Sequence, residues 1–242
     1  HSFLPAFLDT LSVNYVAGVR LLDFQTFPET SPHEINAWVE DQTEQRIRNL
    51  IPQGGVTSLT RLVLANAIYF KAAWASPFRE QSTVDGPFFR LDGTSVAVPM
   101  MTQQETFPYF EGEAVKAVEL PYSGGELSMV LLVPDTAAFR EFENGLTPAR
   151  LDEILGGLAS TRLALTLPKF EFDAELSLRE TLSRMGMPNA FANADFSAID
   201  GTRELAISNV FHKAFVAVDE EGTEAAAATA VGVGVTSVPE AP

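Results

Sequence analysis

The chain has 242 residues, with 16 Lys and Arg against 32 Asp and Glu, so its formal net charge at pH 7 is −16. Hydrophobic residues make up 46% and charged residues 20%, which is typical of a folded protein and excludes a disordered one. The acidic excess argues against nucleic acid or an anionic membrane as a partner, and the absence of cysteine excludes disulfides, thiol nucleophiles and cysteine-built zinc sites. With only three histidines, no metal or other cofactor is expected.

The first part of the chain is predicted to be mostly helical. An amphipathic run predicts a helix over residues 4–15, and a short strand-like segment follows at 19–24. Ser31-Pro32-His33-Glu34 has the residues of a capping box, so a second helix is predicted from Ser31 to about Leu50. No apolar run reaches the roughly 18 residues that a membrane helix needs.

The rest of the chain is predicted to contain strands with helices grouped between them. The nearly continuous apolar stretch from Leu59 to Phe70 predicts a strand covered on both faces. Further strands are expected at 96–101, 114–120, 127–133, 162–167 and 205–219, and helices at 136–144, 148–158 and 176–185. This grouping, without an internal repeat or a dividing linker, predicts an α+β fold.

The segment 219–242 is rich in alanine, glycine and valine, and it has two interpretations. Low-complexity stretches are most often flexible linkers. However, every second residue from Thr223 to Val235 is β-branched or apolar, whereas the residues between them are small except for Glu224. Because a strand buries one face through such a period of two, we interpret the segment as an exposed loop that can become an inner strand.

Energetics limit what could drive such an insertion. Ordering one residue costs about 1–2 kcal/mol of backbone entropy, whereas each ladder hydrogen bond returns about 1 kcal/mol. Backbone pairing alone is therefore insufficient. Burial of the valines and relief of strain in the sheet must supply the difference, so the starting fold is expected to be metastable.

Several segments follow one another in a recognisable order over almost the whole chain. They are Ile35–Val39, Leu64–Trp74 with Pro77-Phe78, Val98–Met101, Leu167–Phe170, Leu182–Ile199 and Ile207–Ala214 running into Val218–Ala230. In this order they resemble the serpin family, and the chain is identified as an inhibitory, prokaryotic member.

The resemblance implies a serpin fold, with a large central mixed β-sheet, additional β-sheets and peripheral helices. Because the family's domain is longer than this chain, we expect residues 1–242 to be a single incomplete domain. The N-terminal helices and C-terminal strands would then come from complementary fragments of the same protein, or from the rest of a longer chain of which these residues are a part. We expect the protein to act outside cells, as most relatives do, and the loop to be inserted in the sheet.

The resemblance also implies a suicide inhibitor of serine proteases rather than an enzyme. The target protease cleaves an exposed loop and forms an acyl-enzyme, and the cut loop then inserts into the central sheet and traps it. Loop insertion in serpins is a known case of strand addition that releases stored strain. The implied reactive-centre loop is 220–242, and its proximal hinge is Glu220, Glu221, Gly222, Thr223, Glu224, Ala225, Ala226, Ala227 and Ala228.

The family's usual loop length places the reactive bond between Thr236 and Ser237. The small β-branched residue before this bond favours a chymotrypsin-like, elastase-like or subtilisin-like protease over a trypsin-like one. Within the hinge, Thr223 is expected to be the first side chain to enter the sheet.

Other residues match two control regions of the family. Asn66 and His212 match the shutter, a hydrogen-bond cluster beneath the central strands, although a self-satisfied buried pair is the simpler interpretation. Trp74, Lys169 and Glu220 match the breach, where the loop first enters the sheet. A core tryptophan and a solvated ion pair worth under about 1 kcal/mol are the corresponding simpler interpretations.

Two other functions are weighed against inhibition. A hydrolase is disfavoured because the sequence has no Gly-x-Ser-x-Gly or His-Glu-x-x-His motif, and neither His33 nor His212 lies in a triad context. The closer alternative is a non-inhibitory serpin that binds, carries or chaperones another molecule. Thr223 and the small residues Ala225–Ala228 favour inhibition, because non-inhibitory relatives often carry bulky or charged residues there.

Overall fold

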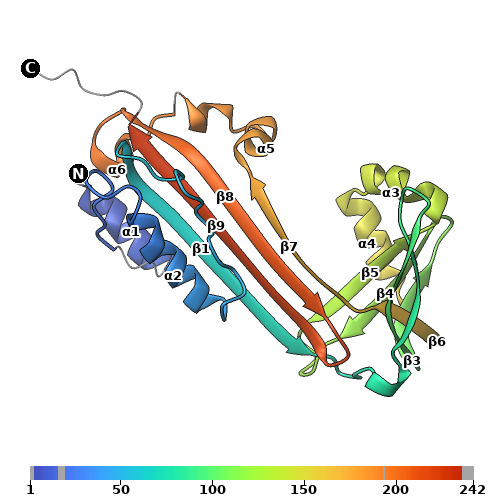
Figure 1. The fold of residues 1–242 in the computed structure, drawn as a ribbon. Coiled ribbons are helices and arrows are strands. Elements are labelled where there is room, and N and C mark those ends of the chain that lie inside the picture. The colour runs from blue at the N-terminus through green and yellow to red at the C-terminus, as the bar shows by residue number, and fades with distance from the viewer. Residues whose placement is uncertain (1–2, 16–19, 193, 236–242) are drawn as a thin grey trace, which may run out of the picture. The chain divides into compact units, whose positions relative to one another are not determined.

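The computed structural model of the chain describes residues 3–15, 20–192 and 194–235. These fall into two compact units: unit 1 comprises the described residues of 3–69, 173–215 and 225–235, and unit 2 comprises residues 70–172 and 216–224. The chain passes between the units inside strands, not through a linker. Helices and sheets are grouped as an α+β fold, which confirms the predicted class (Figure 1). None of the described helices is long and apolar enough to cross a membrane.

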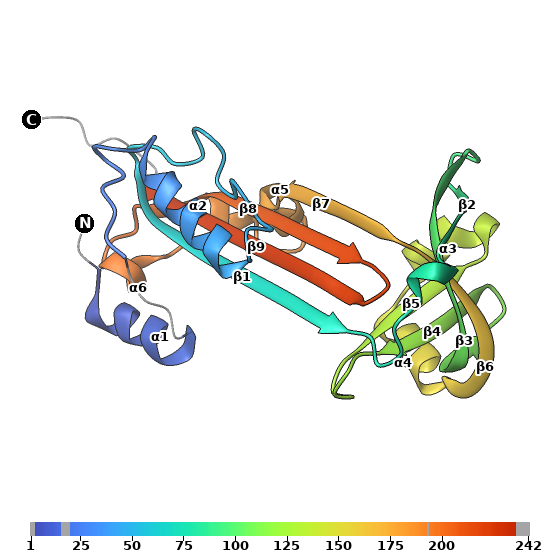
Figure 2. The same ribbon diagram turned by 60° about the horizontal axis from the view of Figure 1, so that its bottom comes forward.

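The central sheet has four strands in the order β1-β9-β8-β7. They are β1 (Thr60–Ala73), β9 (Gly222–Val235), β8 (Leu205–Val218) and β7 (Phe170–Ser177). A hairpin joins β8 to β9, closed by the Asp219 amide, which donates to the Gly222 carbonyl at 3.0 Å. Both ribbon views show β9 between β1 and β8 (Figures 1 and 2). The prediction that this segment can be an inner strand is confirmed.

The second sheet belongs to unit 2 and is antiparallel. It contains β2 (Val84–Phe89), β3 (Ser95–Glu111), β4 (Val115–Pro121) and β5 (Ser128–Pro134) in that order, with β6 (Ala159–Pro168) paired to β3. Sequence reasoning missed β2, because Gly86 and Pro87 in its middle are unusual in strands. It also missed β7, although Phe170, Phe172 and Leu176 alternate there with polar residues.

The helices surround these sheets in short pieces. They are α1 (Pro5–Tyr15), α2 (Ser31–Gln42), α3 (Phe139–Gly145), α4 (Pro148–Gly156), α5 (Arg179–Arg184) and α6 (Ser197–Asp200), with 3-10 turns at Glu80–Ser82, Thr136–Ala138 and Pro188–Phe191. The strand-like segment expected at 19–24 is wrong over its described residues, since 20–24 contain no strand.

The second helix differs from its prediction at both ends. Its N-cap is Thr30, so the capping box on Ser31 does not form, and the Ser31 hydroxyl instead hydrogen-bonds the Phe27 carbonyl at 2.8 Å. Its C-terminus lies at Gln42 rather than near Leu50, because Glu44 and Gln45 take left-handed φ angles of 48° and 64°.

Thr43 organises the turn that replaces the rest of this helix. The residue is fully buried; its hydroxyl donates to the Val39 carbonyl at 2.8 Å and accepts from the Ile47 amide at 3.1 Å. Ile47 and Leu50 therefore remain in the core, 0% and 1% exposed, although neither is helical.

The segment after α2 covers one face of β8 in unit 1. The Arg46 guanidinium lies 5.1 Å from the centroid of the Phe215 ring, and Lys213 Nζ donates to the Arg48 carbonyl at 3.1 Å. Since alternate residues of a strand share a face, Lys213 and Phe215 lie on the same covered face of β8.

The face of β9 that is buried differs from the predicted one over the middle of the strand. Thr223 and Val233 are buried as predicted, but residues 225, 227, 229 and 231 are only half-buried, whereas Ala226, Ala228 and Ala230 are at most 2% exposed. The side chains of His212 and Thr229 touch, so the alanines point to the other face, which the segment after α2 covers. Alanine fits a face that is covered this closely.

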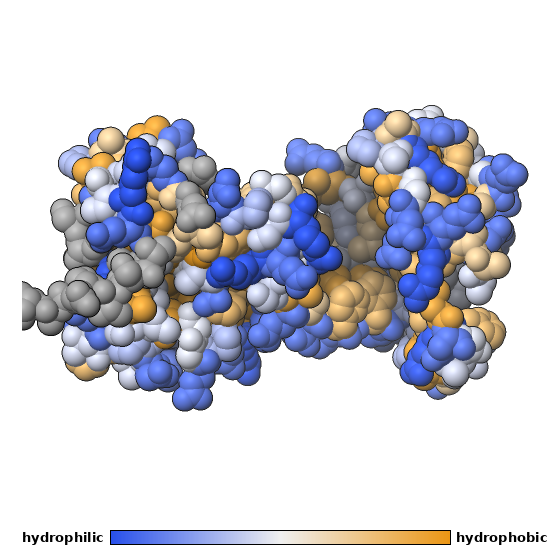
Figure 3. Space-filling view, turned by 90° about the horizontal axis from the view of Figure 1, so that it is seen from above, coloured by the Kyte–Doolittle hydropathy of each residue, from blue (hydrophilic) through white to orange (hydrophobic). Residues whose placement is uncertain are grey.

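The first central strand is covered on one face only, not on both as predicted. Leu64 and Ile68 of β1 are 41% and 56% exposed, and Asn66 between them is exposed as well. Figure 3 shows apolar side chains, in orange, at the surface of the face that it displays.

The hydrogen bonds of Asn36 in this region predict that replacing the residue lowers the stability of the protein. Asn36 is 8% exposed; its Nδ2 donates to the Ile51 carbonyl at 3.0 Å and its Oδ1 accepts from the Ile51 amide at 2.9 Å. Asn36→Ala leaves both backbone groups unpaired, so the free energy of unfolding measured by urea denaturation should fall by about 1–3 kcal/mol. The exposed Gln42→Ala is the control, and an equal loss in both variants would contradict the prediction.

Candidate functional site

The turn between β8 and β9 is held tightly within unit 2. Asp219 Oδ1 accepts hydrogen bonds from the amides of Glu221 and Gly222, at 2.9 and 3.0 Å. A Cβ atom at Gly222 would overlap the carbonyl oxygen of Ala72. Glycine is therefore required here by the close approach of a neighbouring backbone.

The structure brings Lys169 and Glu220 together beside this turn. Lys169 Nζ donates to Glu220 Oε2 at 2.7 Å, and the Thr83 hydroxyl donates to Glu220 Oε1 at 2.8 Å. The Glu220 side chain is 9% exposed and that of Lys169 is 46% exposed. The hydrogen bond from Lys169 holds the pKa of Glu220 below its ordinary value, and the same bond raises the pKa of Lys169. The carboxylate is thus held ionised at the start of β9.

Two aromatic residues hold the first side chain of β9. Trp74, 3% exposed, donates from Nε1 to the Asp219 carbonyl at 3.0 Å, and its ring stacks on Tyr122 with centroids 4.8 Å apart. The Tyr122 hydroxyl donates to Thr223 Oγ1 at 2.9 Å. Burial raises the pKa of Tyr122, so the phenol remains a donor at neutral pH. Sequence reasoning missed Tyr122 and Thr83, because no motif carries them.

His212 is paired with β9 and not with Asn66. His212 Nδ1 lies 2.7 Å from Thr229 Oγ1, whereas Asn66 is exposed on β1. Since β9 separates β1 from β8, the strands of Asn66 and His212 are two spacings, or about 9.5 Å, apart. The shutter role of the two residues remains a prediction. Thr229 was missed, although it is the only hydroxyl in the run of alanines from Ala225 to Ala230.

The remaining predicted residues lie in the turn before β9, in β9 itself, or outside the described residues. Of the hinge, Glu220 and Glu221 lie in the turn and Gly222–Ala228 form the first half of β9. Thr236 and Ser237, the predicted reactive bond, lie outside the described residues.

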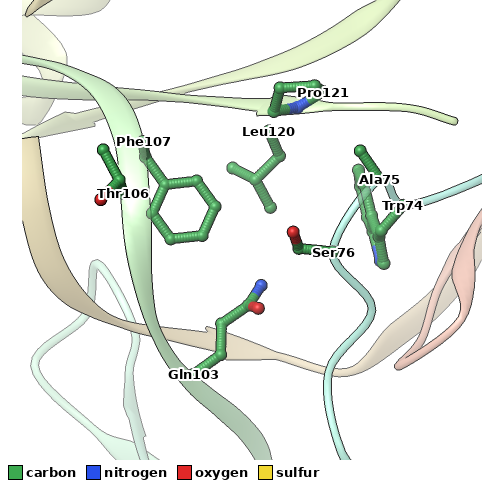
Figure 4. A pocket seen from close by; sticks show the side chains of 8 residues that line it. All are labelled: Trp74, Ala75, Ser76, Gln103, Thr106, Phe107, Leu120 and Pro121. Atoms are coloured by element: carbon green, nitrogen blue, oxygen red, sulfur yellow. The ribbon is translucent and has the colours of Figure 1, made fainter. Parts of the chain in front are cut away.

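A small cavity borders this cluster in unit 2. It has a volume of about 70 Å³, and Trp74, Gln103, Phe107 and Leu120 are among the residues that line it (Figure 4). None of its lining residues is titratable, although Gln103 Nε2 is buried without a partner in the described structure. Elsewhere among the described residues, no cluster of three His, Asp or Glu side chains could hold a metal ion.

Comparisons with known proteins agree on one family. A family model described as Serpin (serine protease inhibitor) matches residues 1–242. An uncharacterised serpin-like protein of Thermococcus kodakarensis is 43% identical over 96% of this chain and 54% of its own length. Leukocyte elastase inhibitor A of Rattus norvegicus is 41% identical over 95% of this chain and 64% of its own length. The chain thus spans between about half and two thirds of the length of these relatives.

Solved structures show the same similarity. Emu ovalbumin superposes with a TM-score of 0.95 at 32% identity, over the whole of this chain and 64% of that chain. A structure described as cleaved Serpin 42Da superposes with a TM-score of 0.90 at 35% identity, over 97% of this chain and 64% of that one. The predicted serpin fold is therefore confirmed.

The Lys169–Glu220 pair predicts a pH dependence of stability. Folding lowers the pKa of Glu220 below its ordinary value of 4.5. The ionised carboxylate therefore contributes to the free energy of unfolding above pH 4.5, and this contribution is lost as the pH falls through the lowered pKa of the folded state. The difference in free energy of unfolding between wild type and Glu220→Gln should be largest near neutral pH and shrink below about pH 4.5. Because solvent screens the half-exposed Lys169, this difference in free energy of unfolding should not exceed about 1 kcal/mol.

Urea denaturation between pH 7 and pH 3 would measure this difference. The control is Glu111→Gln, whose side chain is 61% exposed and 3.6 Å from Lys116 Nζ. A difference for Glu220→Gln that does not change with pH would show that the ion pair contributes nothing.

Proposed function

The chain belongs to the serpin family, and from this premise we propose that the protein inhibits serine proteases as a suicide substrate. The protease would cleave a loop that includes β9, form an acyl-enzyme, and be trapped when the cut loop enters the central sheet. The observation that carries the proposal is the position of residues Gly222–Val235 between β1 and β8. Inhibitors among the relatives, such as the rat leukocyte elastase inhibitor, support protease inhibition.

The contacts of β9 support insertion as the driving step. In the middle of the strand, the tightly covered face carries only alanine (Ala226, Ala228 and Ala230). On the other face, Thr223 and Thr229 find hydroxyl and imidazole partners in Tyr122 and His212. Fourteen residues at about 3.4 Å each give a strand about 48 Å long. A protease attached near the end of such a strand would be displaced by the width of a domain.

The region where the strand begins supports the assignment of the breach. Trp74, Lys169 and Glu220 surround the first residues of β9, and each contacts the turn or belongs to it. We propose that this cluster guides the hinge into the sheet, and that Asn66 and His212 pair when β9 is absent. His212 would then exchange Asn66 for Thr229 during insertion.

A non-inhibitory serpin that binds or carries another molecule is the second candidate. The side chains of the hinge argue against it, because Ala226 and Ala228 are 2% and 1% exposed and leave no space for bulkier residues. Larger residues there would require the segment after α2, which covers this face of β9, to move away.

Incubation with proteases tests the inhibitory function directly. The full-length protein would be mixed with chymotrypsin, elastase, subtilisin or trypsin, and the products separated under denaturing conditions. We expect a covalent complex with one of the first three enzymes, and a released peptide that begins at Ser237. Cleavage of the loop by all of them without any covalent complex would contradict inhibition and favour a carrier or binding role.

The buried position of Thr223 predicts that Thr223→Arg abolishes trapping. Thr223 is 4% exposed and bonded to Tyr122, so a buried guanidinium there would lack space and a partner. The variant should be cleaved by the protease at the wild-type rate but yield no denaturation-resistant complex. Glu221→Arg places the same side chain on an exposed residue of the turn and should still trap. Trapping by Thr223→Arg equal to that of wild type would refute the insertion mechanism.

A further inference from the structure

We propose that Ser208 is a latch that holds the far half of β9 in the sheet and determines how often a cut loop traps its protease. The Ser208 hydroxyl, on β8, donates to the carbonyl oxygen of Gly232 at 2.9 Å. The inference rests on the proposed function, because it assigns a positioning role within loop insertion. No motif in the sequence marks Ser208 for such a role.

The order of side-chain contacts along β9 places this latch last. Thr223 meets Tyr122 at the start of the strand, Thr229 meets His212 in the middle, and Gly232 meets Ser208 near the end. Insertion from the hinge forms these contacts in that order. The Ser208 bond therefore forms when most of the strand is already in place, at the stage where insertion competes with hydrolysis of the acyl-enzyme.

The last third of β9 fits between β8 and the residue before β1 because it carries glycine at two positions. A Cβ atom at Gly232 would lie 3.1 Å from Ser208 Oγ, and a Cβ atom at Gly234 would lie 2.9 Å from the Leu59 carbonyl oxygen. Glycine weakens a strand unless another group must approach closely. The two glycines thus leave the strand free of side chains where Ser208 contacts it from one side and the residue before β1 from the other.

The backbone around Ser208 is held by contacts that do not involve β9. Arg179 Nη1 donates to the Ser208 carbonyl at 2.7 Å, and the Leu178 amide donates to the Val210 carbonyl at 3.0 Å. Arg179 is itself stacked on Phe191, 5.1 Å from the ring centroid. The latch is therefore preorganised, so forming the bond to Gly232 requires ordering of the incoming strand alone.

Comparison of the uncut and cut forms of Ser208→Ala tests the latch. The hydroxyl has its loop partner only when β9 is in the sheet, so the variant should lower the Tm of the loop-cleaved protein by about 2–4 °C and leave the Tm of the uncut protein unchanged. Melting both forms in one fixed concentration of guanidinium brings both transitions into range. The control is Ser128→Ala, which removes an exposed hydroxyl bonded to Glu119 Oε1 at 2.6 Å and should shift both forms equally.

The outcomes separate the latch from the function on which it rests. A cleaved wild type that is no more stable than the uncut protein would contradict insertion itself. If cleavage stabilises the wild type but Ser208→Ala melts like wild type in both forms, or lower in both, the latch is wrong and insertion stands.

Trapping and a double-mutant cycle give two further measurements. Ser208→Ala should consume up to about fivefold more inhibitor per protease trapped, with an unchanged rate of association, because the bond forms after cleavage. Gly232→Ala should destabilise the cut form through its contact with the hydroxyl, and less so in the Ser208→Ala background. An equal loss in both backgrounds, or unchanged trapping by Ser208→Ala, would overturn the proposal.

Discussion

The space between β1 and β8 is the constraint on which the rest of this structure depends. A strand can lie there only if it pairs on both edges and its side chains fit under the cover of one face. The almost completely buried Ala226, Ala228 and Ala230 satisfy this condition, and so does Gly222, which lies against the Ala72 carbonyl. The composition of β9, which looks like that of a flexible linker, is therefore the composition that an inner strand of this sheet requires.

Polar groups complement this steric fit along the strand. The Glu220 carboxylate accepts from Lys169 and Thr83 at the turn, and hydroxyl partners follow at Thr223 and Thr229. Each bond contributes little by itself, about 1 kcal/mol, but each also prevents the larger cost of an unpaired polar group. A strand that slipped by one residue would lose these bonds and place larger residues on the tightly covered face. The polar contacts thus specify the register that packing alone would leave ambiguous.

Sequence reasoning succeeded where a pattern is local. The long strands β1 and β8, the α+β class and the inner strand after Gly222 follow from periodicity and from family motifs. It failed where contacts with other segments of the chain determine the local structure. The helix from Ser31 ends at Gln42, because buried Thr43 caps a turn instead, and β2 forms despite a central Gly86-Pro87 because β3 pairs with it. Neither partner can be identified from the segment itself.

The sequence by itself determined the family and the pairing of Lys169 with Glu220, since both follow from residues in a recognisable order. Only the tertiary structure decided which face of β9 is buried and that His212 contacts Thr229 rather than Asn66. Periodicity shows that a strand has two unlike faces, but it does not show which of them a neighbour covers. Contacts between strands depend on what lies between them, and that information is absent from either strand alone.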